Sequence, residues 1–144
     1  MALNTVDEDR VAVFGGSYGG YSAYCQVLKY PELYDAGIAW MGMTDLEGLY
    51  EETMPNYRTE MLEYYLGTPD ENPELYHERS PINHADSLSC PLLILHGEND
   101  SRIPINQAER FRNTLIGHGY EEGPEGDLEY KELSGEGHGS TVLC

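Results

Sequence analysis

The sequence predicts an α/β fold built on four mainly parallel strands with crossover helices. Near-continuous apolar runs recur along the chain, and amphipathic helical patterns lie between them. Strands of a parallel sheet are buried on both faces, so they appear as continuous apolar runs. Strands that alternate with helices are joined by right-handed crossovers. The 144 residues contain no repeat and no break in composition, so we expect one domain.

Four segments have the composition of strands, and they cover residues 10–16, 35–41, 91–97 and 128–133. The first three are the apolar runs, which suits buried strands. The fourth alternates apolar Leu128, Tyr130 and Leu133 with charged residues. This pattern predicts a strand at the edge of the sheet.

Helical patterns fill the intervals between these segments. The first has apolar residues at helical spacing at Tyr21, Tyr24, Cys25 and Leu28, and Pro31 is expected to end it. A second follows Pro104, a favourable residue for a first helical turn, and Gly117 is expected to end it. Residues 46–66 are expected to be helical, with a break at residues 54–56.

The charge of the chain limits its partners. Asp and Glu number 26 against 8 Lys and Arg, which gives a net charge of −18. Such a charge repels phosphates, so we expect neither nucleic acid nor an anionic membrane as a partner. A solvated acidic face explains this composition. Adaptation to high salt explains it as well, since screening weakens the self-repulsion, and the scarcity of lysine favours this halophilic interpretation.

Other features suggest a cytoplasmic protein without a metal. No apolar stretch approaches the length of a membrane-spanning helix, and the first ten residues do not resemble a secretion signal. Cys25, Cys90 and Cys144 are far apart and show no metal-ligand spacing, so we expect reduced thiols.

The glycine-rich turn after the first predicted strand carries a candidate nucleophile. Its sequence is Gly15-Gly16-Ser17-Tyr18-Gly19, which matches the G-x-S-x-G nucleophile elbow. Glycines let the backbone adopt strained torsions and approach closely, so the serine hydroxyl can project from the tip of the turn. The N-terminus of the following helix favours negative charge that develops there. The context of a buried strand and an amphipathic helix favours this interpretation over a phosphate-binding or merely tight glycine turn.

A serine nucleophile needs a base and a group that orients the base. Asp100 follows the third predicted strand, and His138 follows the fourth between two glycines. In this fold the chain order is serine, acid, histidine. We therefore predict a catalytic triad of Ser17, Asp100 and His138. His96, at the end of the third strand, is expected to brace the turn.

The segments "GGSYGGY", "HGENDSRIP" and "GEGHG" resemble the catalytic domain of the prolyl oligopeptidase family of serine peptidases. The chain looks most like the branch that contains acylaminoacyl peptidases and dipeptidyl aminopeptidases. The resemblance implies a partial α/β-hydrolase fold, with the triad named above and the Tyr18 N–H as an oxyanion donor. It also implies that Trp40, Arg102 and Ile103 border the substrate pocket.

The resemblance also implies that parts of the family domain are missing. Residues 1–144 correspond to its C-terminal portion, and the N-terminal half and the final helix have no counterpart. The strand that carries the serine would then lack a neighbour, and one face of the sheet would lack its helices. We expect such an edge and such a patch to favour homodimers or aggregation.

The leading functional prediction is a serine peptidase that hydrolyses short or N-blocked peptides through an acyl-enzyme on Ser17. A peptide is the expected partner, and no cofactor or metal is expected. Two alternatives stay open. The first is a carboxylesterase of the same fold. The second is an inactive truncated remnant that acts only as an association module.

Overall fold

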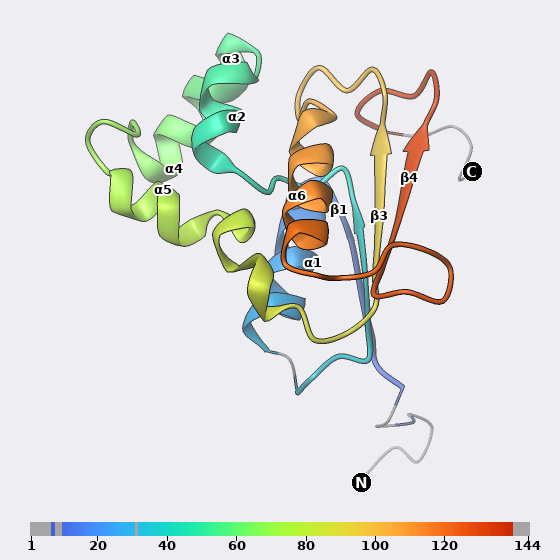
Figure 1. Cartoon of the computed structure of the whole chain (residues 1–144). Coiled ribbons are helices and arrows are strands. Elements are labelled where there is room, and N and C mark those ends of the chain that lie inside the picture. Colours follow the sequence, from blue (N-terminus) through green and yellow to red (C-terminus); the bar gives the residue numbers. More distant parts are fainter. Residues whose placement is uncertain (1–6, 8–9, 31, 140–144) are drawn as a thin grey trace, which may run out of the picture.

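A four-stranded parallel sheet organises the protein (Figure 1). The computed structural model describes residues 7, 10–30 and 32–139, so the predictions for Pro31 and Cys144 lie outside the described residues. The strands are β1 (Ala12–Gly16), β2 (Ala36–Trp40), β3 (Leu92–Gly97) and β4 (Leu128–Leu133). They pair in the order β1-β2-β3-β4, and every pair is parallel. The predicted α/β class is confirmed, and β4 lies at an edge as expected.

One face of the sheet is covered by helices α1 (Tyr18–Lys29) and α6 (Asn106–Gly117) (Figure 1). The ring of Tyr24 in α1 meets that of Phe111 in α6 edge to face, with 4.9 Å between centroids. Both rings are fully buried over Ala39, Leu92 and Ile94 of the central strands. This layer is the main hydrophobic core. It fixes the positions of α1 and α6 relative to the sheet, and with them the turns at the carboxyl ends of the strands.

The opposite face of the sheet is open within the described part of the chain (Figure 1). Phe14, Ile38 and Leu93 occupy one row across β1, β2 and β3 in the pairing register. Phe14 is 64% exposed, and the other two are partly exposed. The strand pattern therefore buries one set of alternate residues under helices and leaves the other set in contact with solvent.

A mainly helical segment connects β2 to β3 and lies beside the sheet (Figure 1). Its elements are α2 (Leu46–Glu52), α3 (Pro55–Tyr57), the π-helix η1 (Arg58–Glu63), α4 (Tyr64–Leu66), α5 (Pro73–Arg79) and the 3-10 helix η2 (Pro81–Ser87). The expected helix over residues 46–66 is interrupted after Glu52, in agreement with the predicted break. The segment forms a second core around buried Met43, Leu46, Leu49, Leu62, Tyr76 and Ile103.

A buried glutamine attaches this segment to α6. The Oε1 atom of Gln107 accepts hydrogen bonds from the N–H groups of Thr44 and Asp45, at 3.0 and 2.9 Å. The Thr44 hydroxyl donates to the Gln107 carbonyl at 2.6 Å. Buried backbone N–H groups need such partners, so Gln107 fixes the path of the chain just after β2.

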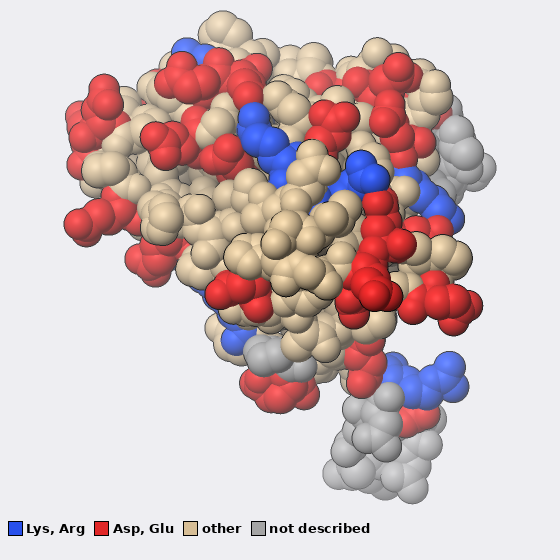
Figure 2. Space-filling view, in the orientation of Figure 1, with Lys and Arg blue, Asp and Glu red and all other residues tan. Residues whose placement is uncertain are grey.

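Acidic side chains are spread over the visible surface, and basic ones are few (Figure 2). Of the helices that the structure describes, none has the length and apolar character required to cross a bilayer. The described residues also contain no group of three His, Cys, Asp or Glu side chains that could hold a metal ion.

Candidate active site

Ser17 lies at the tip of the tight turn between β1 and α1. Its φ of 58° and ψ of −119° lie outside the usual regions for a residue with a side chain. The Ser17 N–H donates to the Trp40 carbonyl at 2.9 Å, which ties the turn to the end of β2. A Cβ atom at Gly15 would collide with the Gly19 carbonyl, so the turn requires glycine there. The glycines therefore permit a strained turn that presents the serine hydroxyl at the helix N-terminus.

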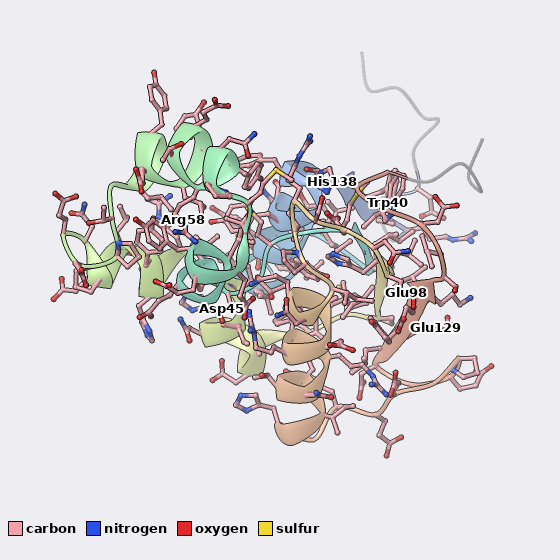
Figure 3. The ribbon with its side chains drawn as sticks, turned by 90° about the horizontal axis from the view of Figure 1, so that it is seen from above. Trp40, Asp45, Arg58, Glu98, Glu129 and His138 are labelled. Atoms are coloured by element: carbon pink, nitrogen blue, oxygen red, sulfur yellow. The ribbon has the colours of Figure 1, made fainter. Side chains whose placement is uncertain are left out.

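A chain of hydrogen bonds joins Ser17, His138 and Asp100. The Oγ atom of Ser17 lies 2.8 Å from Nε2 of His138. The Nδ1 atom of the same ring lies 2.7 Å from Oδ2 of Asp100. Because a carboxylate only accepts, Nδ1 carries the hydrogen, and Nε2 is left as the acceptor for the serine hydroxyl. The structure thus brings the three predicted side chains together at the carboxyl edge of the sheet, which Figure 3 views from above with His138 labelled.

The environment of Asp100 keeps its carboxyl group ionised. Burial is the largest effect on the pKa of Asp100 and acts to raise it, because the residue is only 5% exposed. Hydrogen bonds outweigh that effect and leave the pKa below its ordinary value: one from His138, and two to Oδ1 from the N–H groups of Ile103 and Arg102, each at 2.9 Å. An ionised Asp100 stabilises the Nδ1–H tautomer of His138 and would stabilise its protonated ring.

His96 supports the turn that carries Asp100. Its Nε2 lies 2.7 Å from the Ile103 carbonyl, to which it donates, and 3.7 Å from Oδ2 of Asp100. Complete burial of the ring lowers its pKa, and the Ile103 carbonyl and Asp100 only partly oppose this effect. His96 is therefore neutral at neutral pH and braces the turn, as the sequence suggested.

The loop that carries His138 packs tightly on the end of β3. The Asn99 N–H donates to the Glu136 carbonyl at 2.8 Å. The carboxylate of Glu98 accepts from the Ser134 hydroxyl at 3.0 Å and from the Gly135 N–H at 3.1 Å. Glu98 and Asn99 thus anchor the loop of His138, and Asp100 follows them directly. The acid and the loop of the base are therefore attached to the same short segment after β3.

The first turn of α1 provides free N–H groups beside Ser17. These groups have no partner within the helix, because they precede its first hydrogen-bonded turn. In the described part of the chain, the Tyr18 N–H has no acceptor outside the helix either. Such a donor beside a nucleophile suits the stabilisation of an oxyanion, which is the role that the family resemblance implies for the Tyr18 N–H.

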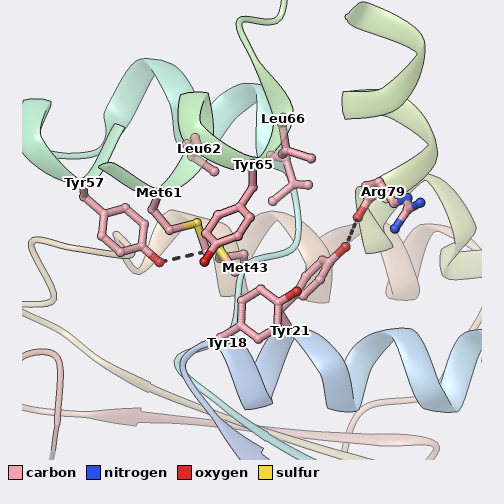
Figure 4. Close-up of a pocket in the computed structure, with 10 residues that line it drawn as sticks. Tyr18, Tyr21, Met43, Tyr57, Met61, Leu62, Tyr65, Leu66 and Arg79 are labelled. Atoms are coloured by element: carbon pink, nitrogen blue, oxygen red, sulfur yellow. Dashed lines mark hydrogen bonds between the residues drawn. The ribbon is translucent and has the colours of Figure 1, made fainter. Parts of the chain in front are cut away.

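A cavity of about 640 Å³ opens beside Tyr18, the residue that follows the candidate nucleophile (Figure 4). One wall is α1, with Tyr18 directly after Ser17 and Tyr21 one turn further. The other wall comes from the segment of residues 57–66 and consists of Tyr57, Met61, Leu62, Tyr65 and Leu66. Met43 and Leu46 also contribute, and Arg79 lies at one end. The cavity can take a large apolar or aromatic group.

The three residues proposed to border the substrate pocket lie at different places. Trp40 ends β2, and its indole packs near Gly16, with Cε3 3.2 Å from the position of a Cβ there. Arg102 has an exposed side chain, and Ile103 is fully buried in the second core. The described lining of the 640 Å³ cavity contains none of these residues. Their contact with substrate stays a prediction.

Sequence reasoning missed several residues that position the site. Gly97 and Glu98 hold the loop of His138, and the "HG" pair at the end of β3 was the available signal for Gly97. Gln107 is a polar residue on the buried side of an otherwise apolar helix face, which is a usable signal for a buried polar contact. Arg79 gave no signal, because its place beside the cavity depends on tertiary structure.

A serine, a histidine and a carboxylate linked in this order form the arrangement of serine hydrolases. The model of the "Prolyl oligopeptidase family" matches residues 1–142. The chain therefore belongs to the prolyl oligopeptidase family, as its motifs predicted.

Named relatives agree with this assignment. The chain is 32% identical over 108 residues to dipeptidyl aminopeptidase BIII of Pseudoxanthomonas mexicana, covering 72% of this chain and 16% of that protein. It is 32% identical over 120 residues to the acylamino-acid-releasing enzyme of Mus musculus, covering 76% and 16%. Among solved structures, a puromycin hydrolase superposes with a TM-score of 0.82 at 32% identity, covering 94% of this chain and 20% of that one. The chain thus spans about a sixth to a fifth of the length of these proteins.

Proposed function

We propose that the protein is a serine peptidase that hydrolyses short or N-blocked peptides through an acyl-enzyme on Ser17. The observation that supports this function most strongly is the hydrogen-bonded chain from Ser17 through His138 to Asp100. The strained backbone at Ser17 adds support, because strain of this kind concentrates at functional sites.

The acylation step follows from the positions of these atoms. Ser17 Oγ attacks the carbonyl carbon of the scissile bond, and its proton passes to Nε2 of His138. The carbonyl oxygen becomes an oxyanion, which the Tyr18 N–H stabilises. The carbon–nitrogen bond then breaks, His138 returns the proton to the leaving amine, and the acyl group remains on Ser17.

Water completes the cycle by the same route in reverse. His138 takes a proton from water as the oxygen attacks the acyl carbon, and it then protonates Ser17 Oγ as the ester bond breaks. Asp100 remains ionised throughout and balances the charge on the ring. No cofactor is required by this sequence of steps.

The names of the relatives and the shape of the cavity support the substrate class. The name of one relative says that it releases acylamino acids, and the name of another says that it is a dipeptidyl aminopeptidase. The apolar cavity beside Ser17 has room for the side chain on the acyl side of the scissile bond. Short or N-blocked peptides are consistent with both observations.

Steady-state kinetics test the proposal against the esterase alternative. Acyl-peptide p-nitroanilides and p-nitrophenyl esters of the same acyl group are compared for the wild-type chain, with Ser17→Ala as the control. The proposal requires turnover of the anilides that Ser17→Ala abolishes. Turnover of esters alone would favour the carboxylesterase, and no turnover by a folded chain would favour the inactive association module.

The open face of the sheet supports association between chains. Phe14 is exposed at the outer strand β1, in one row with Ile38 and Leu93, and an unpaired apolar strand edge favours pairing with another chain. Sedimentation velocity of the wild type and of Phe14→Glu tests this association. Dimers or larger species that Phe14→Glu dissociates are expected, and a wild-type monomer would contradict it.

A further inference from the structure

Arg79 is a cation at the wall of the cavity, and the other lining residues that the structure describes are uncharged. It ends α5, has an exposed side chain, and contributes to the same 640 Å³ cavity as Tyr18, the residue after the candidate nucleophile. The other described lining residues are tyrosine, methionine and leucine. Figure 4 shows Arg79 at one end of the cavity, with Tyr57 at the other.

Arg79 has no ion-pair partner among the described residues, although the chain is strongly acidic. Asp and Glu number 26 against 8 Lys and Arg. Arg110, Arg112 and Lys131 each pair with a carboxylate, at N···O distances from 2.5 to 3.4 Å. Over the described residues, Arg79 makes no such ion pair, and neither do Lys29, Arg58 and Arg102. Arg79 differs from these three because it is the one that lines the cavity in the described part of the chain.

The groups beside Arg79 do not compensate its charge. Tyr21 donates a hydrogen bond from its hydroxyl to the Arg79 carbonyl at 2.9 Å, which ties the end of α5 to α1. Burial raises the pKa of the Tyr21 phenol, and burial also raises the pKa of the Cys25 thiol. Both groups are therefore neutral at neutral pH, and within the described residues no carboxylate forms an ion pair with the guanidinium.

We propose that the cavity selects acyl groups that carry a carboxylate at the end of an apolar stem, and that the guanidinium of Arg79 binds this carboxylate. The inference rests on the proposed serine-peptidase function, because it places this group on the acyl side of the bond cleaved at Ser17. Acidic residues such as glutamate and dicarboxylic acyl caps belong to this class.

The chemistry of the cavity matches both ends of such a group. Methylene groups bury apolar surface against the tyrosine, methionine and leucine side chains. A guanidinium binds a carboxylate through two parallel hydrogen bonds, and such charge-assisted bonds are stronger than neutral ones. A ligand that fills the cavity also shields the pair from water, which strengthens it.

Two fluorophosphonates of equal length test the inference and separate it from the proposed function. One carries an alkyl chain that ends in a carboxylate, and the other ends in a carboxamide. The rate of Ser17 labelling is measured at the lowest KCl concentration at which circular dichroism shows a folded chain. The carboxamide reagent reports only on the reactivity of Ser17, and the ratio of the two rates reports on Arg79.

The expected result is about tenfold faster labelling by the carboxylate reagent in the wild type. Arg79→Gln should bring the ratio of the two labelling rates close to one, and Arg79→Lys should keep part of the preference. Lys29→Gln makes the same charge change on an exposed residue of α1 and should leave the preference intact. If the two reagents label the wild type at equal rates, or if Arg79→Gln leaves the ratio of the rates unchanged, the inference is overturned while the proposed function stands.

A folded chain that neither reagent labels contradicts the proposed function. Calorimetric titration of the Ser17→Ala variant with the monoamide and the diamide of heptanedioic acid then decides whether the cavity binds a carboxylate. The inference expects the monoamide to bind about tenfold more tightly, and Arg79→Gln to remove the difference. Equal binding of the two amides would overturn the inference independently of catalysis.

Discussion

A side chain at Gly97 would collide with the backbone at Gly137. A Cβ atom at Gly97 would lie 2.5 Å from the Gly137 carbonyl oxygen and 2.7 Å from that of Glu136. The end of β3 and the loop of the candidate base are therefore in close backbone contact. This contact places His138 within reach of Asp100.

Gly97→Ala is expected to move that loop and lower the reactivity of Ser17. A misplacement of about 1 Å can reduce a rate about 100-fold, so we expect a loss of that order in the rate of fluorophosphonate labelling. Gly117→Ala is the matched control, because nothing lies within 4 Å of its Cβ position. Equal labelling rates in both variants would show that the contact at Gly97 does not position His138.

Asp100→Asn preserves the shape of the acid but removes its charge. An amide carries no negative charge to stabilise the protonated ring of His138, and its N–H group can donate to Nδ1 and so favour the wrong tautomer. We therefore expect the rate of acylation to fall by about 10⁴-fold. Stopped-flow acylation with a p-nitrophenyl ester measures the rate, and circular dichroism reports the fold. A folded variant that retains most of its rate would contradict the role assigned to Asp100.

The stability of the protein is expected to fall as the pH drops below about 6.5, and His96 is one cause. Burial holds the pKa of His96 below its ordinary value of about 6.5, so in this range the unfolded chain binds more protons than the folded chain. Stability therefore decreases as pH falls from the ordinary pKa through the lowered one.

His96→Gln tests this dependence, because glutamine has a donor for the Ile103 carbonyl but does not titrate. Urea unfolding at pH 7.5, 6.5 and 5.5 gives the free energy of unfolding of both proteins. The free energy of unfolding of the variant is expected to change less with pH across this range than that of the wild type. Parallel curves would mean that His96 titrates alike in the folded and unfolded chains.

Salt is expected to stabilise the protein, in keeping with the halophilic interpretation of its composition. A net charge of −18 on 144 residues gives strong self-repulsion, and this repulsion weakens as the Debye length shortens. The thermal midpoint should rise as KCl increases from about 0.1 to 2 M, where the Debye length falls from about 10 Å to below 3 Å. A midpoint that stays constant would favour the simpler view that the acids form a solvated surface.

The strands and the order of the site residues could be predicted from the sequence because both depend on local patterns. Apolar runs mark β1, β2 and β3, and the glycines around Ser17 are required by the turn that they form. Position in the chain was enough to select Asp100 and His138, since each follows a strand.

Other features could not be predicted because they arise from tertiary contacts. The short helix α5 buries only Tyr76, so it has no apolar period, although Pro73 after Asn72 is a recognisable start. The cavity forms where α1 faces the segment of residues 57–66, and these walls are far apart in sequence. The pairing of Gln107 with Thr44 likewise spans 63 residues.

The most direct test of the central claim is fluorophosphonate labelling of the purified chain, with the modified residue identified by mass spectrometry. Parallel samples in dilute buffer and in about 2 M KCl, with circular dichroism on each, ensure that folded protein is examined. We predict stoichiometric labelling at Ser17 in the wild type and loss of labelling in a folded His138→Ala variant. A folded wild-type chain that does not label at Ser17, or that labels equally without His138, would contradict the proposed acyl-enzyme function.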